Sequence, residues 1–120
     1  MGRHRYPEIG ELVATAMREN RLDNKGLAAA AYLLGQDYGY DFRLGPSALE
    51  THIASVKQGY IWAGGSPNTK NAARKIERLA WLMLTLRIPK EHPLIQQLRE
   101  NEDTRLTYPP IQGETLAGLL

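Results

Sequence analysis

The residue types that most often do chemistry are sparse in this sequence of 120 residues. It has no cysteine, which excludes disulfides, thiolate metal ligands and cysteine nucleophiles. His4, His52 and His92 are spread over the whole chain, with no two of them at helical spacing. Gly64-Gly65-Ser66 lacks the spacing of a phosphate-binding loop, and no serine lies in a nucleophile-elbow pattern. We therefore expect no enzyme, no metal site, no cofactor and no small-molecule ligand.

Short polar side chains between positions 46 and 58 are better suited to binding than to catalysis. Leu49, Ile53 and Val56 recur there at the spacing of a buried helical stripe. The opposite face offers hydroxyl, carboxylate and amide groups, on Ser47, Glu50, Thr51, Ser55 and Gln58. Such a face is typical of a solvated helix or of a helix that reads polar groups on a partner.

Basic residues gather in the middle of the chain, although the formal net charge is only +2. Between positions 68 and 90, Glu77 is the only acid, against Lys70, Arg74, Lys75, Arg78, Arg87 and Lys90. Lys70, Arg74 and Arg78 lie at i, i+4 and i+8 and so share one side of a helix. This row is the footprint of a phosphate-binding face, or else of an ordinary solvated face.

Apolar periodicity predicts a compact all-α bundle of about five helices. Pro7, Pro46 and Pro93 suit first helical turns, Asp23 or Asn24 suits a cap, and glycines follow two of the segments. The predicted helices are 7–19, 25–34, 46–58, 70–86 and 93–101.

The segments between the predicted helices also contain residues that predict their structure. Gly35 is expected to stop the second helix and to open a long turn, 35–45, whose aromatic residues indicate packing against the body. Residues 60–66 could form a small hairpin. We expect residues 1–101 to form one domain and residues 102–120 to form an arm that is partly disordered or docked.

No segment is expected to enter a membrane. The basic N-terminus is not followed by an apolar run of the kind found in signal peptides. The longest apolar stretches, 27–34 and 79–86, are too short to span a bilayer. We therefore expect a soluble, cytoplasmic protein.

Two stretches carry a family resemblance that covers roughly residues 9–98. Ile53-Ala-Ser-Val-Lys-Gln-Gly59 has the isoleucine-to-glycine spacing at the end of a recognition helix, and Leu82-Met-Leu-Thr-Leu86-Arg-Ile88 is similar to a closing helix. Together they resemble the Cro and cI-type (XRE-like) helix-turn-helix family. The turn at 35–45 is longer than the family's, and the longer connection after Gly59 makes a winged helix the close alternative.

The resemblance implies a sequence-specific transcriptional regulator, a phage or bacterial repressor, that binds double-stranded DNA. It implies that the helix 46–58 contacts base edges, through Ser47, Ala48, Glu50, Thr51, His52 and Ser55. Backbone contacts would come from Arg43, Lys57, Gln58, Asn68, Thr69, Lys70, Arg74 and Arg78.

Two further expectations concern partners. A homodimer could form through Trp81, Leu82 or the leucine-ended tail. The alternative function is a helical protein–protein interaction module, an adaptor or inhibitor that does not bind DNA. The long aromatic turn and the tail motivate that alternative.

Overall fold

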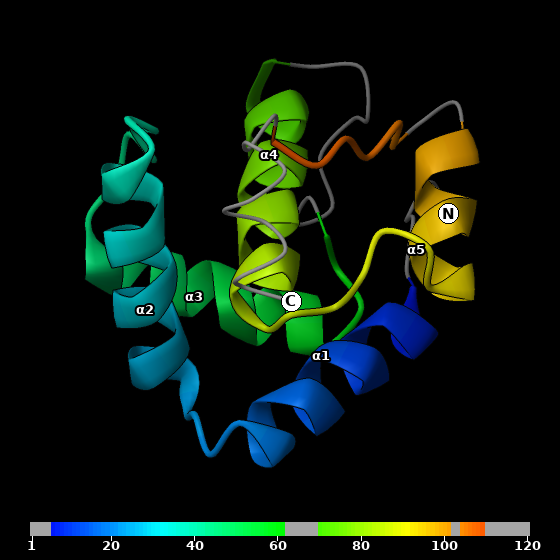
Figure 1. Ribbon diagram of the computed structural model, residues 1–120, viewed down its shortest axis with the longest axis horizontal. Helices are drawn as coiled ribbons and strands as arrows, with labels where there is room; N and C mark the ends of the chain where they lie inside the picture. Colours follow the sequence, from blue (N-terminus) through cyan, green and yellow to red (C-terminus); the bar gives the residue numbers. More distant parts are fainter. Residues whose placement is uncertain (1–5, 62–69, 102–103, 110–120) are drawn as a thin grey trace.

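Five helices make up the ordered elements of the computed structural model, which describes residues 6–61, 70–101 and 104–109 (Figure 1). The described residues contain no strand, so the expected all-α fold class is confirmed. The helices are α1 (Pro7–Glu19), α2 (Asn24–Asp37), α3 (Pro46–Lys57), α4 (Lys70–Thr85) and α5 (Pro93–Glu100).

The helix ends follow from local sequence. A proline occupies the first turn of α1, α3 and α5, where a missing N–H group costs little. Asp23 caps α2, because its Oδ1 accepts a hydrogen bond from the N–H of Gly26 at 2.7 Å. Gly59, just beyond α3, has a φ of +93°, which favours glycine. The bounds predicted for four of the helices therefore agree with the structure to within one residue.

The second helix is the exception, because Gly35 does not end it. α2 continues to Asp37, and Gly35 is buried within it. A Cβ at this position would lie 2.6 Å from Cε2 of Phe42. The glycine therefore makes room for an aromatic ring from the following turn, and the expectation that it terminates the helix was wrong.

The helices surround α4, which runs through the centre of Figure 1 with α2 beside it and α3 crossing behind. α2 contacts both α3 and α4, and α1 contacts α3. Trp81 and Leu82 are 4% and 0% exposed, so the apolar surface of α4 packs within this chain. The largest fully buried side chains come from every helix but the first, and include Leu27, Leu49, Ile53, Leu79, Leu82, Met83 and Ile95.

The segment 104–109 also packs on this body. Leu106 is 2% exposed, and its N–H donates a hydrogen bond of 3.0 Å to the carbonyl of Leu98. The hydroxyl of Thr104 donates to the same carbonyl, and that of Tyr108 donates to the carbonyl of Ile88 at 2.6 Å. These contacts join the first part of the expected arm to α5 and to the connection between α4 and α5. The remainder, with Leu116, Leu119 and Leu120, lies outside the described residues.

None of the helices in the described ranges is both long and apolar enough to cross a membrane.

Candidate nucleic-acid interface

Helix α3 is held by two neighbouring helices. Its apolar stripe, Leu49, Ile53 and Val56, is 0% exposed. On α2, the small buried residues Ala28 and Ala31 allow a close approach to α3. At the other end, α1 approaches so closely that a Cβ on Gly10 would lie 2.4 Å from the carbonyl oxygen of Lys57. The orientation of α3 is therefore fixed by packing on both sides.

The outer face of α3 carries short polar side chains. Ser47, Ala48 and Thr51 are exposed, and Glu50 and Ser55 are half-buried. Ser47, Thr51 and Ser55 follow one another at i, i+4 and i+8 and so form one row along the helix. Hydroxyl groups can donate to or accept from a base edge, and the Thr and Ala methyl groups can contact a thymine methyl. Of the predicted base-contact set, the structure leaves Ser47, Ala48 and Thr51 exposed and Glu50 and Ser55 half-buried.

His52 does not belong to this accessible row. It is 8% exposed, and its Nε2 has no hydrogen-bond partner among the described residues. Burial lowers the pKa of His52 to about 4, with further contributions from the positive charges of Arg78 and Lys75 on α4. The side chain lies on the inner edge of α3, so little of this predicted base-contact residue is accessible to a DNA groove.

Several of the predicted phosphate-binding side chains are exposed. Arg43 lies just before α3 in a left-handed conformation with φ of 60°, and its N–H donates to Oδ1 of Asp41 at 2.8 Å. Lys57 lies at the end of α3, where its Nζ donates to Oδ1 of Asn24 at 3.0 Å. The exposed set also includes Gln58, Lys70 and Arg74. Positive charge is therefore available beside both ends of α3.

Arg78 is the member of the basic row that the structure removes from the surface. It is 9% exposed, and its Nε donates a hydrogen bond of 3.1 Å to the carbonyl of Phe42. The guanidinium ties the connection between α2 and α3 to α4. Little of Arg78 is therefore accessible to a phosphate, and one of its donors, the Nε–H, is used inside the fold.

The remaining predicted contacts lie outside the described residues. These are Asn68, Thr69 and the expected hairpin beyond residue 61. Where that hairpin would begin, Ile61 is 0% exposed and belongs to the core, and Tyr60 donates its N–H to the carbonyl of Ser55 at 2.9 Å.

Among the described residues, no three His, Asp or Glu side chains are grouped so that they could hold a metal ion.

The aromatic side chains of the α2–α3 connection pack on the body, as their abundance in the sequence indicated. Phe42 is 2% exposed and stacks against Tyr32 with a centroid distance of 5.7 Å. Tyr40 stacks on Trp81 at 5.1 Å. No residue pattern indicates the partner of Arg78, because the Phe42 carbonyl that it binds is a backbone group in a turn.

Comparison with known proteins identifies no relative of this chain. No protein-family model matches the sequence, no curated protein matches it, and no solved structure matches the fold.

Proposed function

We propose that this protein binds double-stranded DNA and that the outer face of α3 enters the major groove. The observation that carries the proposal is the row of Ser47, Thr51 and Ser55, of which the first two are exposed, on a helix whose opposite stripe is fully buried. In helix-turn-helix proteins the recognition helix is held by a preceding helix and presents its N-terminal residues to the bases. Ser47 and Ala48 occupy that position, in the first turn of α3.

The flanking charges support the same proposal. Arg43 and Lys57 are exposed near the two ends of α3, where their cations would contact phosphates on either side of a groove. Lys70 and Arg74 add exposed charge at the start of α4. Phosphate contacts of this kind fix register, while base contacts select sequence. α3 carries no arginine, so we expect hydroxyl and methyl contacts in place of bidentate guanine recognition.

The biological role that we propose is a transcriptional regulator, a repressor of phage or bacterial type acting in the cytoplasm. This part of the proposal rests on the sequence resemblance of the segments at 53–59 and 82–88. Such modules generally bind as dimers to two half-sites. Trp81 and Leu82 are buried within one chain, so a dimer contact would have to use another surface.

The test is a fluorescence-anisotropy titration of duplex DNA at two salt concentrations. We expect binding that weakens steeply with salt, with a slope of roughly one log unit per phosphate contact. Thr51→Glu places a negative charge in the proposed groove-facing row, and we expect it to weaken binding at least about tenfold by repulsion from phosphate. The matched control is Thr15→Glu on the exposed surface of α1, which should bind as the wild type does.

Equal binding by the two glutamate variants would exclude α3 as the reading helix. No binding by the wild type at low salt would exclude the DNA proposal itself. The alternative is then a protein–protein interaction module, which the exposed side chain of Leu33 on α2, 62% accessible, favours. Capture of protein partners with the wild type and with Leu33→Asp would follow.

A further inference from the structure

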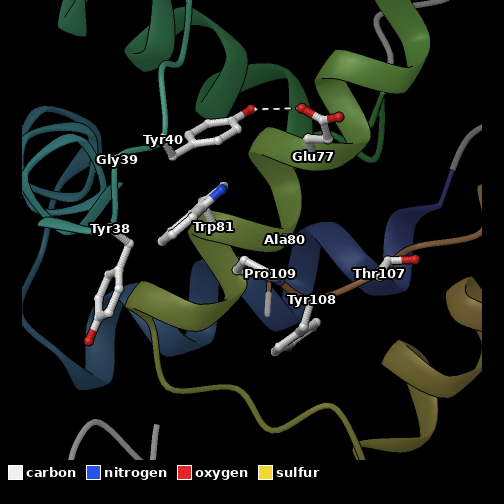
Figure 2. Close-up of a pocket in the computed structure, with 9 residues that line it drawn as sticks. All are labelled: Tyr38, Gly39, Tyr40, Glu77, Ala80, Trp81, Thr107, Tyr108 and Pro109. Atoms are coloured by element: carbon white, nitrogen blue, oxygen red, sulfur yellow. Dashed lines mark hydrogen bonds between the residues drawn. The ribbon is translucent and has the colours of Figure 1, made fainter. Parts of the chain in front are cut away.

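A pocket of about 420 Å³ lies on the side of α4 that the α2–α3 connection covers (Figure 2). Its walls come from three parts of the chain: the turn at 38–40, the middle of α4, and the segment 107–109. The volume falls in the range of small-molecule sites in proteins, roughly 300–1,000 Å³. The three walls are far apart in sequence, so the pocket is a product of the tertiary fold.

Four of the nine described lining residues are aromatic. Trp81 lies between Tyr40, at a centroid distance of 5.1 Å, and Tyr38, at 6.3 Å. Tyr108 forms another wall, and its hydroxyl is held by the carbonyl of Ile88 at 2.6 Å. The mutual contacts of Trp81 and Tyr40 and the anchored hydroxyl of Tyr108 hold three of these rings in place before any ligand arrives. A preformed aromatic site binds a ligand without a large ordering cost.

A single carboxylate gives the pocket its charge. Glu77 is the only charged residue among the described residues that line it. Its Oε1 accepts a hydrogen bond of 3.1 Å from the hydroxyl of Tyr40, as the dashed line in Figure 2 marks. Burial, followed by the charge of Glu77, raises the pKa of Tyr40 to about 12, so the phenol stays a neutral donor at physiological pH.

The nearest positive charge on the same helix does not enter the pocket. Arg78 follows Glu77 in sequence, but its Nε donates to the carbonyl of Phe42, and it is not among the lining residues. The pocket therefore presents aromatic rings together with one carboxylate, and no cationic side chain is among its described lining residues. Ring faces attract cations through their quadrupole, and a carboxylate attracts them directly.

We propose that this pocket binds a small organic cation of the alkylated-ammonium type. The methyl groups of such a ligand would contact the rings of Tyr38 and Tyr108, beside the buried Trp81, and its charge would face Glu77. An anion would be repelled by the carboxylate, and an apolar ligand would gain no attraction from it. The proposal does not depend on DNA binding, although one wall belongs to the connection that leads into α3.

The test is an NMR titration of the isotope-labelled protein with choline and with its neutral isostere 3,3-dimethyl-1-butanol. We expect choline to shift the resonances of residues 38–40 and the Trp81 indole, and to bind about 2- to 30-fold more tightly than the isostere. Glu77→Gln keeps an acceptor for Tyr40 but removes the charge, and should abolish that preference. The matched control, Glu19→Gln on the exposed surface of α1, should leave it unchanged.

A second pair of variants tests the aromatic wall. Tyr38→Leu should weaken choline binding, whereas Tyr38→Phe should retain it, because Tyr38 is 37% exposed and contributes its ring face. Equal binding of choline and the isostere, or an unchanged preference in Glu77→Gln, would overturn the proposal in favour of a plain apolar pocket. No shift at millimolar choline would overturn it outright. If Tyr38→Leu does not fold, the comparison of choline with its isostere, in the wild type and in Glu77→Gln, still tests the proposal.

Discussion

At the scale of single residues, His52 shows how position determines chemistry. Its neighbours on the exposed row of α3 are accessible, yet its own ring is enclosed beside Arg78 and Lys75. An imidazolium there would be desolvated, would have no partner for its Nε2 and would be repelled by two cations, and a hydrogen bond with the Lys75 backbone offsets only part of this. The folded protein therefore favours neutral His52.

This preference makes the free energy of unfolding depend on pH. The pKa of His52 is about 4 in the folded protein and about 6.5 in the unfolded chain, so the unfolded state binds more protons between these values. The contribution of His52 to the free energy of unfolding is complete above about pH 6.5 and is lost as the pH drops towards 4. At pH 5 we expect His52 to account for a loss of about 2 kcal/mol relative to pH 7.5, measured by urea denaturation.

Replacement of the histidine isolates this contribution. His52→Leu should remove most of the loss between pH 7.5 and pH 5, because a leucine of similar volume cannot take up a proton. His92→Asn is the matched control, since His92 caps α5 through its Nδ1 and asparagine is also a good capping residue. That variant should lose stability with pH as the wild type does. An identical pH dependence in His52→Leu would show that His52 is not the titrating group.

At the scale of helices, the crossing of α1 and α3 depends on one glycine. Alanine normally stabilises a helix interior by about 1 kcal/mol relative to glycine. At Gly10, however, the added Cβ would meet the backbone of Lys57, at 2.4 Å from its oxygen and 2.8 Å from its carbon. A backbone group cannot turn away as a flexible side chain can, so α1 would have to move.

We therefore expect Gly10→Ala to lower the free energy of unfolding by about 1–3 kcal/mol, as overpacking does. Gly45→Ser is the control, because no atom lies within 4 Å of a Cβ there and the residue caps α3. It should leave stability unchanged or slightly higher. Chemical denaturation of both variants measures the difference. A gain in stability for Gly10→Ala would show that α1 and α3 are not packed this closely.

At the scale of the whole molecule, the segment 104–109 is joined to the helices. Leu106 is 2% exposed and is anchored to α5 through the Leu98 carbonyl. Truncation of a buried leucine to alanine costs about 2–5 kcal/mol, depending on how far the cavity collapses. A freely moving arm would show no such cost.

We expect Leu106→Ala to destabilise the whole chain by about 2–4 kcal/mol. Circular dichroism and tryptophan fluorescence should still report coincident unfolding transitions, because the segment unfolds together with the helices. Leu33→Ala is the matched control, since that side chain is 62% exposed and should matter little. A loss in Leu106→Ala no larger than in the control would mean that the segment contributes nothing to the core.

The sequence by itself determined the helices. Apolar spacing, prolines at first turns and the Asp23 cap act within a few residues of one another, so they predicted the bounds of all the helices except the end of α2. The same local pattern placed Ser47 and Thr51 opposite the stripe of Leu49, Ile53 and Val56, and the structure leaves both exposed.

Only the tertiary structure decided which residues at the edges of those patterns are buried. Gly35 lies inside α2, where the ring of Phe42 packs against it. Arg78 is enclosed, and its Nε donates a hydrogen bond to the carbonyl of Phe42. His52 is buried because α4 lies against that edge of α3. The aromatic pocket likewise requires three distant segments to meet. Such contacts depend on how helices approach one another in space, and periodicity along one helix contains no information about that approach.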